Sequence, residues 1–285
     1  MKVRKFYLKN ELGQEYSLMD FDNYCFFNGP EGLGISYSND YEKVGYSYIP
    51  NSINLNQNQI SGTAVFQSYD NYKKLVDFIA YSEEIRLFYV IPFEIGEREY
   101  IRDVDIEELS KSEILQNGLL EETLTLNCKS LWYTENTMSF TIGDEEDSLI
   151  WNFKWDSRFV NYSNRKFEFI NTGHIPASIE VEIDGPVENP TISLEVEGTL
   201  AQQISVDTDI VEYEKFLYSS KDNDFYIKKQ NTNGTFTSLF DLTTIDIDND
   251  NVIKIPINKS CSLALTGEQD ILSAKIKVFM YYKAV

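Results

Sequence analysis

Residues 171–194 read NTGHIPASIEVEIDGPVENPTISL, and they carry the clearest strand signal of the C-terminal half. Within 178–184 and again within 191–198, apolar residues alternate with polar ones, which is the period of a β-strand with one buried face. The apolar positions are Ile179, Val181, Ile183, Ile192, Leu194 and Val196, and the acidic positions of the first run are Glu180, Glu182 and Asp184. Residues 185–190 (GPVENP) have the glycine and prolines of a turn. We therefore expect a hairpin whose carboxylates lie on its solvated side.

The single histidine of the chain, His174, lies in the glycine- and proline-bounded segment NTGHIP. Ser-His-Asp catalysis would require its imidazole to be held by a carboxylate within reach of a nucleophile. Ser178 follows closely, but the segment has no GxSxG elbow and no catalytic cysteine signature. We interpret His174 as a turn residue and predict no catalytic residues.

Metal and nucleotide motifs are incomplete. The run DIDNDN begins like a calcium-binding EF-hand loop, with Asp246, Asp248 and Asp250 at the ligand spacing. Asn251 replaces the required glycine and Ile257 the closing acid, which favours a polar hairpin loop, with adventitious calcium as the alternative. The glycines of NGPEGLG (Gly29, Gly32 and Gly34) form neither GxGxxG nor a P-loop and predict a turn. We expect no metal site and no cofactor.

The composition excludes several classes of protein. With 46 acidic and 25 basic residues the net charge is −21, so sequence-specific nucleic-acid binding is not expected. Cys25, Cys128 and Cys261 are isolated, which argues against disulfides and structural zinc and fits folding in a reducing cytosol. The N-terminus shows no signal peptide, and no apolar run is long enough for membrane insertion.

The N-terminal half predicts strands around one helix. In residues 70–84 (DNYKKLVDFIAYSEE) the positions Tyr72, Leu75, Val76 and Ile79 share one helical face, with Asp70 or Asn71 as the N-cap. Strands are expected at 60–67, 85–93 and 97–106, and in 119–133 the even positions Leu120, Leu124, Leu126 and Cys128 predict one buried face. Aromatic enrichment, with 19 Tyr and 18 Phe, favours strands throughout.

The acidic run at 143–148 (GDEEDS) is the best candidate linker, which divides the chain into domains 1–140 and 141–285. Beyond it, short strands separated by turn residues predict a β-sandwich; they are expected in FLYSS, DFYIKKQ, NVIKIPI, SLALTG and ILSAKIKVFMYY. Trp151, Phe153 and Trp155 alternate, as they would on a packed sheet face or on a sugar-stacking surface. With 46 acidic residues, a glycoside hydrolase pair of carboxylates is neither indicated nor excluded.

Four segments of the first half resemble, in order, the distal tail protein family of siphophages that infect Gram-positive bacteria. They are NGPEGLGISYS (28–38), ISGTAVFQSYDNYKKLVDFIAYSEEIRLFYV (60–90), YIRDVDIEELSKSEI (100–114) and LLEETLTLNCKSLWY (119–133). In the second half, residues 171–194, YEKFLYSSKDNDFYIKK and SLFDLTTIDIDNDNVIKIPINKSCSLALTG are similar to the family's C-terminal galectin-like sandwich.

The resemblance implies a mainly β structural protein of the virion, without enzyme activity. Domain 1–140 would form a homohexameric ring, the hub between the tail tube and the baseplate or tail tip, and the galectin-like domain 141–285 would project from it. Tail tube and tail-tip or baseplate proteins would be its partners, with assembly in the cytoplasm of the host bacterium. The alternatives are a carbohydrate-binding receptor module for cell-wall polysaccharide and a wall-degrading glycosidase; no sugar-binding residue is identified.

Overall fold

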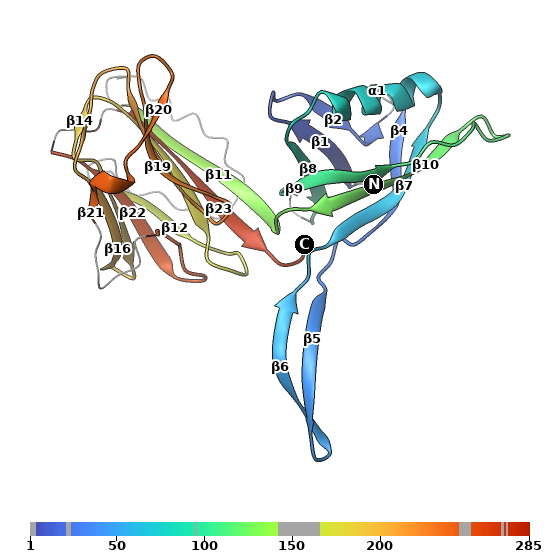
Figure 1. Ribbon diagram of the computed structural model, residues 1–285, viewed down its shortest axis with the longest axis horizontal. Helices are drawn as coiled ribbons and strands as arrows, with labels where there is room; N and C mark the ends of the chain where they lie inside the picture. The colour runs from blue at the N-terminus through green and yellow to red at the C-terminus, as the bar shows by residue number, and fades with distance from the viewer. Residues whose placement is uncertain are drawn as a thin grey trace. The chain divides into compact units, whose positions relative to one another are not determined.

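The computed structural model describes residues 4–20, 24–94, 96–141, 166–244, 252–268, 271 and 273–285. They form antiparallel sheets, with a single α-helix among them, so the mainly β fold class with one helix is confirmed (Figure 1). The chain divides into two compact units, Met1–Tyr133 with Tyr282–Val285, and Thr134–Tyr281. The expected boundary at 140/141 stays a prediction, because the acidic run 143–148 on which it depends lies outside the described residues.

The first unit is built on a sheet that closes on itself. Seven strands follow one another by pairing in the order β1-β8-β9-β10-β7-β4-β3, and β2 returns to pair with β1. Only Leu18 separates β2 from β3; its N–H donates to the carbonyl of Phe6 and its carbonyl accepts from the N–H of Phe27. The strands are β1 (Lys5–Asn10), β2 (Glu15–Ser17), β3 (Met19–Asp20), β4 (Cys25–Glu31), β7 (Gln59–Phe66), β8 (Ile85–Pro92), β9 (Glu97–Leu109) and β10 (Leu120–Cys128).

Alternate side chains of these strands fill the core of the first unit. The four predicted positions of β10 are buried, so that prediction is confirmed: Leu120, Leu124, Leu126 and Cys128. They pack with residues from the other strands, including Phe6, Leu8, Phe27 and Phe66. Burial of each large apolar side chain contributes about 1.5–3 kcal/mol, which makes this cluster the main source of the unit's stability.

Helix α1 (Tyr69–Ala80) covers this core, with Leu75 buried and Tyr72 and Ile79 packed against the cluster as predicted (Figure 1). The predicted N-cap is wrong by two or three residues, because the cap is Ser68 rather than Asp70 or Asn71. Ser68 has extended backbone, and its hydroxyl accepts a hydrogen bond of 3.3 Å from the N–H of Asn71. This contact satisfies one of the amide donors left free at the start of a helix.

Replacing the cap is expected to destabilise the first unit modestly. Ser68→Ala removes the acceptor for the N–H of Asn71 and should lower the free energy of unfolding by about 1 kcal/mol. Asp70→Ala, at the position that the sequence favoured, should cost at most a few tenths of that. Urea titration of both variants by circular dichroism checks this, and a larger loss for Asp70→Ala would contradict the cap assignment.

The chain passes between the units twice. Strand β11 (Trp132–Thr141) begins in the first unit, and β23 (Ser273–Tyr282) ends there. The C-terminal residues Tyr282 and Val285 pack against the first unit's core, and the rings of Tyr100 and Tyr282 meet edge to face at 5.3 Å. The first unit therefore includes the C-terminus, which the sequence did not indicate.

The second unit is a sandwich of two antiparallel sheets that bury their facing side chains. The first sheet contains β20 (Phe236–Ser238), β19 (Asp224–Gln230), β18 (Lys215–Lys221), β13 (Ser178–Asp184), β23 and β11. The second contains β12 (Lys166–Ile170), β22 (Ser260–Thr266), β15 (Thr191–Val196), β16 (Thr199–Val206) and β21 (Thr243–Thr244). A short pair, β14 (Val187–Glu188) with β17 (Asp209–Ile210), and a 3-10 turn, η2 (Phe240–Leu242), complete it.

The predicted hairpin of residues 178–196 does not exist. Strand β13 pairs with β18 and β23, whereas β15 pairs with β16 and β22, so the two strands lie in different sheets. Residues 185–190 cross between the sheets and include β14. The alternation itself is confirmed, since Ile179, Val181 and Ile183 are buried. Alternation shows which face of a strand is buried but does not identify its partner, because facing strands of a sandwich have the same pattern as paired ones.

The carboxylates of β13 lie on its other face, in ion pairs with neighbouring strands. Glu180 contacts Lys221 at 2.7 Å and Lys277 at 3.8 Å. Glu182 and Asp184 share Lys215. These acids neutralise the charges of their neighbours across the sheet, as cross-strand pairs do.

Several other predictions need correction or lie outside the described residues. NVIKIPI forms no strand; Ile255 and Ile257 make isolated bridges to Ala177 and Asn171. The glycine turn at 28–34 begins inside β4, which runs to Glu31. Positions outside the description include Trp151, Phe153, Trp155, Asp246, Asp248, Asp250 and Asn251.

Alkaline pH is expected to weaken the second unit through Tyr218. This side chain is fully buried, and burial raises the pKa of its phenol from 10.0 to about 12. The unfolded chain ionises first, so the contribution of Tyr218 to the free energy of unfolding should fall between pH 10 and 12, by on the order of 2 kcal/mol, and be constant below that range. Urea titrations across this range check the slope. Tyr218→Phe should reduce the slope, and an unchanged slope would contradict the assignment.

Candidate assembly surface

The first unit carries a hairpin that contributes nothing to its core. Strands β5 (Tyr37–Val44) and β6 (Ser47–Leu55) pair only with each other among the described strands, and every residue in them is exposed (Figure 1). Gly45 and Tyr46 join the strands, and Gly45 has the positive φ of 65° that such a two-residue turn needs. We call residues 37–55 the arm.

The two faces of the arm differ in polarity. Residues directly opposite each other point to the same side, so the register between β5 and β6 assigns each side chain to a face. The apolar face carries Tyr37, Leu55, Asn39, Ile53, Tyr41, Pro50, Lys43 and Tyr48. The polar face carries Ser38, Asn54, Asp40, Ser52, Glu42, Ile49, Val44 and Ser47. One side therefore presents three tyrosines, isoleucine, leucine and proline to solvent.

A β-bulge creates this segregation. The register shifts between Asp40 and Tyr41, which leaves Asn51 without an opposite residue in β5 and places Pro50 opposite Tyr41. Proline lacks the amide that a ladder requires and is tolerated at bulges. Beyond the bulge, Tyr48 joins the apolar face and Ile49 turns to the other side.

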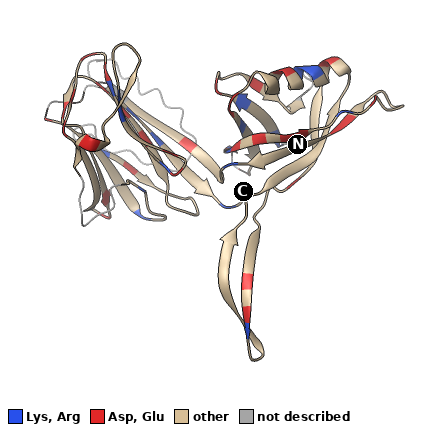
Figure 2. Cartoon of the chain, in the orientation of Figure 1, with Lys and Arg blue, Asp and Glu red and all other residues tan. Residues whose placement is uncertain are grey.

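Charge is sparse on the arm. Its only charged residues are Asp40, Glu42 and Lys43, all on β5, and Figure 2 shows β6 without any. Lys43 alone lies on the apolar face. A partner for this face is therefore expected to be held by apolar contact rather than by ion pairs.

An isolated ribbon of two strands is marginally stable in water, and contiguous exposed apolar residues mark interaction surfaces. The exposed fractions on the apolar face, 50% for Tyr41 and 59% for Ile53, are those of side chains with no cover in the single chain. The arm therefore has the exposed apolar side chains that are typical of association surfaces.

Polar contacts anchor the base of the arm, which we call the root (residues 32–36 and 56–59). The amide of Asn58 donates to the carbonyl of Gly34 at 2.7 Å and accepts from the hydroxyl of Ser36 at 2.9 Å. Gln57 donates to the carbonyl of Cys128, and Gln59 donates to Asn127. These bonds connect both strands of the arm to the end of β10, so the arm leaves the unit through a defined root.

Gly32 and Trp132 pack the root against the unit. Gly32 has φ +81°, and a Cβ there would lie 1.8 Å from the carbonyl oxygen of Gln59. The indole of Trp132, fully buried, donates to the carbonyl of Leu33 at 3.1 Å. The close approach of Gly32 to the backbone of Gln59 requires glycine. The indole of Trp132 holds the backbone of the next residue, Leu33, in place.

Arg102 is the buried charge beside the root. Its guanidinium lies 5.1 Å from the ring centre of Trp132 and donates through Nε to the carbonyl of Ser130. Burial lowers the pKa of Arg102, while burial raises the pKa of the Cys128 thiol nearby. The thiol is thereby kept protonated, in a structural role.

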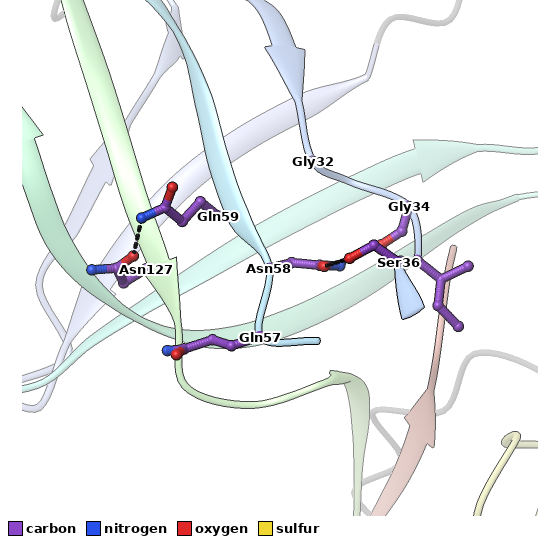
Figure 3. Close-up of a pocket in the computed structure, with 8 residues that line it drawn as sticks. Gly32, Gly34, Ser36, Gln57, Asn58, Gln59 and Asn127 are labelled. Carbon is purple, nitrogen blue, oxygen red and sulfur yellow. Dashed lines mark hydrogen bonds between the residues drawn. The ribbon is translucent and has the colours of Figure 1, made fainter. Parts of the chain in front are cut away.

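The root also lines an open pocket of about 550 Å³. Four of its eight lining residues carry amide side chains, which Figure 3 shows, and Ile35 supplies an apolar wall. The lining residues are Gly32, Gly34, Ile35, Ser36, Gln57, Asn58, Gln59 and Asn127. With no charged side chain in the lining, the pocket suits a neutral polar group.

Among the described residues, those singled out in the sequence do not converge on one site. His174 lies in the second unit, where its backbone N–H donates to the carbonyl of Tyr281 at 2.7 Å. Cys25, Cys128 and Cys261 are buried free thiols. Within the described ranges no group of three or more potential metal ligands occurs, and no helix is long and apolar enough to cross a membrane. Only Gly32 and Gly34 belong to the candidate surface.

Residues 5–129 match the family model described as the distal tail protein, N-terminal domain. No match was found among curated proteins. A chain of the phage P2 baseplate in its activated conformation superposes with a TM-score of 0.66 at 16% identity, and each chain is covered completely. The SPP1 Dit protein superposes with a TM-score of 0.55 at 13% identity over 98% of both chains.

Proposed function

We propose that the chain is a structural component of a phage tail and assembles as a ring of six copies, because residues 5–129 match the family model of the distal tail protein N-terminal domain. The ring would be the hub between the tail tube and the baseplate or tail tip. Similarity in fold to the phage P2 baseplate chain and to SPP1 Dit supports a structural role in the tail over enzymatic activity.

The observation that carries the proposal is the apolar face of the arm. A hub that forms by association of its copies needs a surface that is exposed in the single chain and buried in the assembly. The strands of the arm are fully exposed in the single chain, as such a surface would be. Its recipient lies elsewhere on the next copy, so the contact is heterologous. Such contacts generate a closed ring when the rotation between copies closes.

The two units would serve different ends of this assembly. Domain 1–140 would form the ring, and domain 141–285 would be the galectin-like sandwich that projects from it toward tail-tip or baseplate proteins. Carboxylates that line the lumen of the ring would repel DNA passing through it. The net charge of −21 would then keep DNA from binding to the wall of the lumen.

Negative-stain imaging of the purified chain over a range of concentrations tests the proposal. Annular particles with sixfold class averages are the expected result, and adding the cognate tail tube protein should cap tubes at one end. Particles that stay single at every concentration and in the presence of the tube protein would contradict it.

A further inference from the structure

We propose that Tyr46, at the tip of the arm, inserts into the root pocket of the next copy of the chain. The inference rests on the proposed ring and names the contact that would close it. It requires a tip that makes no contacts in the single chain, a pocket whose lining can bind a tyrosine side chain, and an arm long enough to reach the next copy.

The side chain at the tip of the arm is completely exposed in the single chain. Tyr46 has a relative exposure of 104%, the highest among the exposed large hydrophobic residues. It follows Gly45 in a turn of two residues, so its side chain is presented beyond the ends of both strands. A fully solvated tyrosine contributes nothing to the fold, whereas tyrosine is among the residues that dominate protein interfaces because it joins an apolar ring to a polar hydroxyl.

The root pocket matches this side chain. Its volume of about 550 Å³ admits an aromatic ring, and Ile35, 39% exposed, offers an apolar wall. Gln57 and Gln59 use their amide nitrogens on Cys128 and Asn127, and within the described structure no hydrogen bond reaches their Oε1 atoms. These oxygens are acceptors for the one proton that a tyrosine hydroxyl donates. Neither tip nor pocket carries charge, so burial leaves no unpaired ion.

The length of the arm fits a ring. Strand β6 has nine residues, and at about 3.3 Å per residue the arm spans roughly 30 Å from root to tip. In a sixfold ring the distance between equivalent points on neighbours equals their distance from the axis. Arms that join root to root therefore place the roots on a circle of roughly 30 Å radius, which leaves a lumen inside it.

The contact explains why the two features occur in one chain. The tip of each copy would occupy the root of the next, and the same polar root that fixes an arm's direction would receive its neighbour's tip. Each arm would lie along the adjacent copy, with its apolar face covered. The interface is then head to tail, and every tip and every pocket is used when the ring closes.

Paired cysteines test the contact in the full-length chain. The variant Tyr46→Cys with Ile35→Cys, treated with a short bis-maleimide, should give covalent oligomers up to six chains, and little beyond. The native thiols are buried, which keeps background reaction low. Tyr46→Cys with Tyr81→Cys is the matched control, since Tyr81 is 76% exposed at the end of α1, and it should give no ladder.

The single variants decide between alternatives. Tyr46→Cys alone giving efficient dimers would show that tips meet each other and would overturn the inference. Rings visible by imaging with no ladder from the Tyr46/Ile35 pair would also overturn it, while leaving the proposed hub intact. Absence of rings even in the presence of the tube protein would contradict the hub itself. As a second readout, Tyr46→Ala should weaken self-association at least tenfold, and equal association would count against insertion.

Discussion

Replacing Tyr41 and Ile53 by serine is expected to abolish self-association of the chain at micromolar concentration without altering its fold. Both side chains lie on the apolar face of the arm, half or more exposed in the single chain. In the ring they would be buried against a neighbour. Burying such a side chain contributes about 1.5–3 kcal/mol, so the double substitution should raise the dissociation constant by a factor on the order of 100 to 10,000.

The arm offers its own control. Val44 and Ile49 are each 52% exposed but lie on the polar face. Val44→Ser with Ile49→Ser removes a similar apolar area and should leave association nearly unchanged. Sedimentation velocity of the three proteins makes the comparison, with circular dichroism to show that all are folded. Equal weakening by both double variants would mean that the faces of the arm do not differ in function.

Trp132→Ala is expected to lower the free energy of unfolding of the first unit by about 3–5 kcal/mol. The indole is completely buried between the root of the arm and Arg102, and its N–H satisfies the carbonyl of Leu33. Truncation leaves a cavity, removes that donor and exposes one side of a buried guanidinium to empty space. The loss approaches the total stability of many domains.

Urea unfolding followed by circular dichroism measures this effect. Trp132→Phe retains most of the ring volume but not the donor, so it should lose clearly less than the alanine variant. Tyr81→Ala, at an exposed position of α1, should change stability by less than about 0.5 kcal/mol. A loss below 1 kcal/mol for Trp132→Ala would show that Trp132 does not support the root.

The parts of the fold that depend on burial were predictable. The helical face of Tyr72, Leu75 and Ile79 and the alternation in β10 both report contact with a core, because a buried face imposes its period on the sequence. The helix start was misplaced because three polar residues within four positions, Ser68, Asp70 and Asn71, can all cap, and only backbone geometry selects one.

The arm escaped prediction for the converse reason. It has no buried face, and the bulge at Pro50 moves the apolar residues of β6 out of strict alternation. Gly45 between Val44 and Tyr46 was the available signal of a hairpin turn. The return of Tyr282 and Val285 to the first unit could not be read from the sequence either, because nothing local specifies which core a terminal strand joins.

The mass of the native assembly tests the central claim, that the chain associates with itself through the arm. Native mass spectrometry of the purified protein, with the arm intact or replaced by a short glycine-serine turn, measures it in one experiment. The intact chain is predicted to show a species at six times 33.0 kDa, and the armless chain a single copy. The same distribution of masses for both proteins would contradict the account.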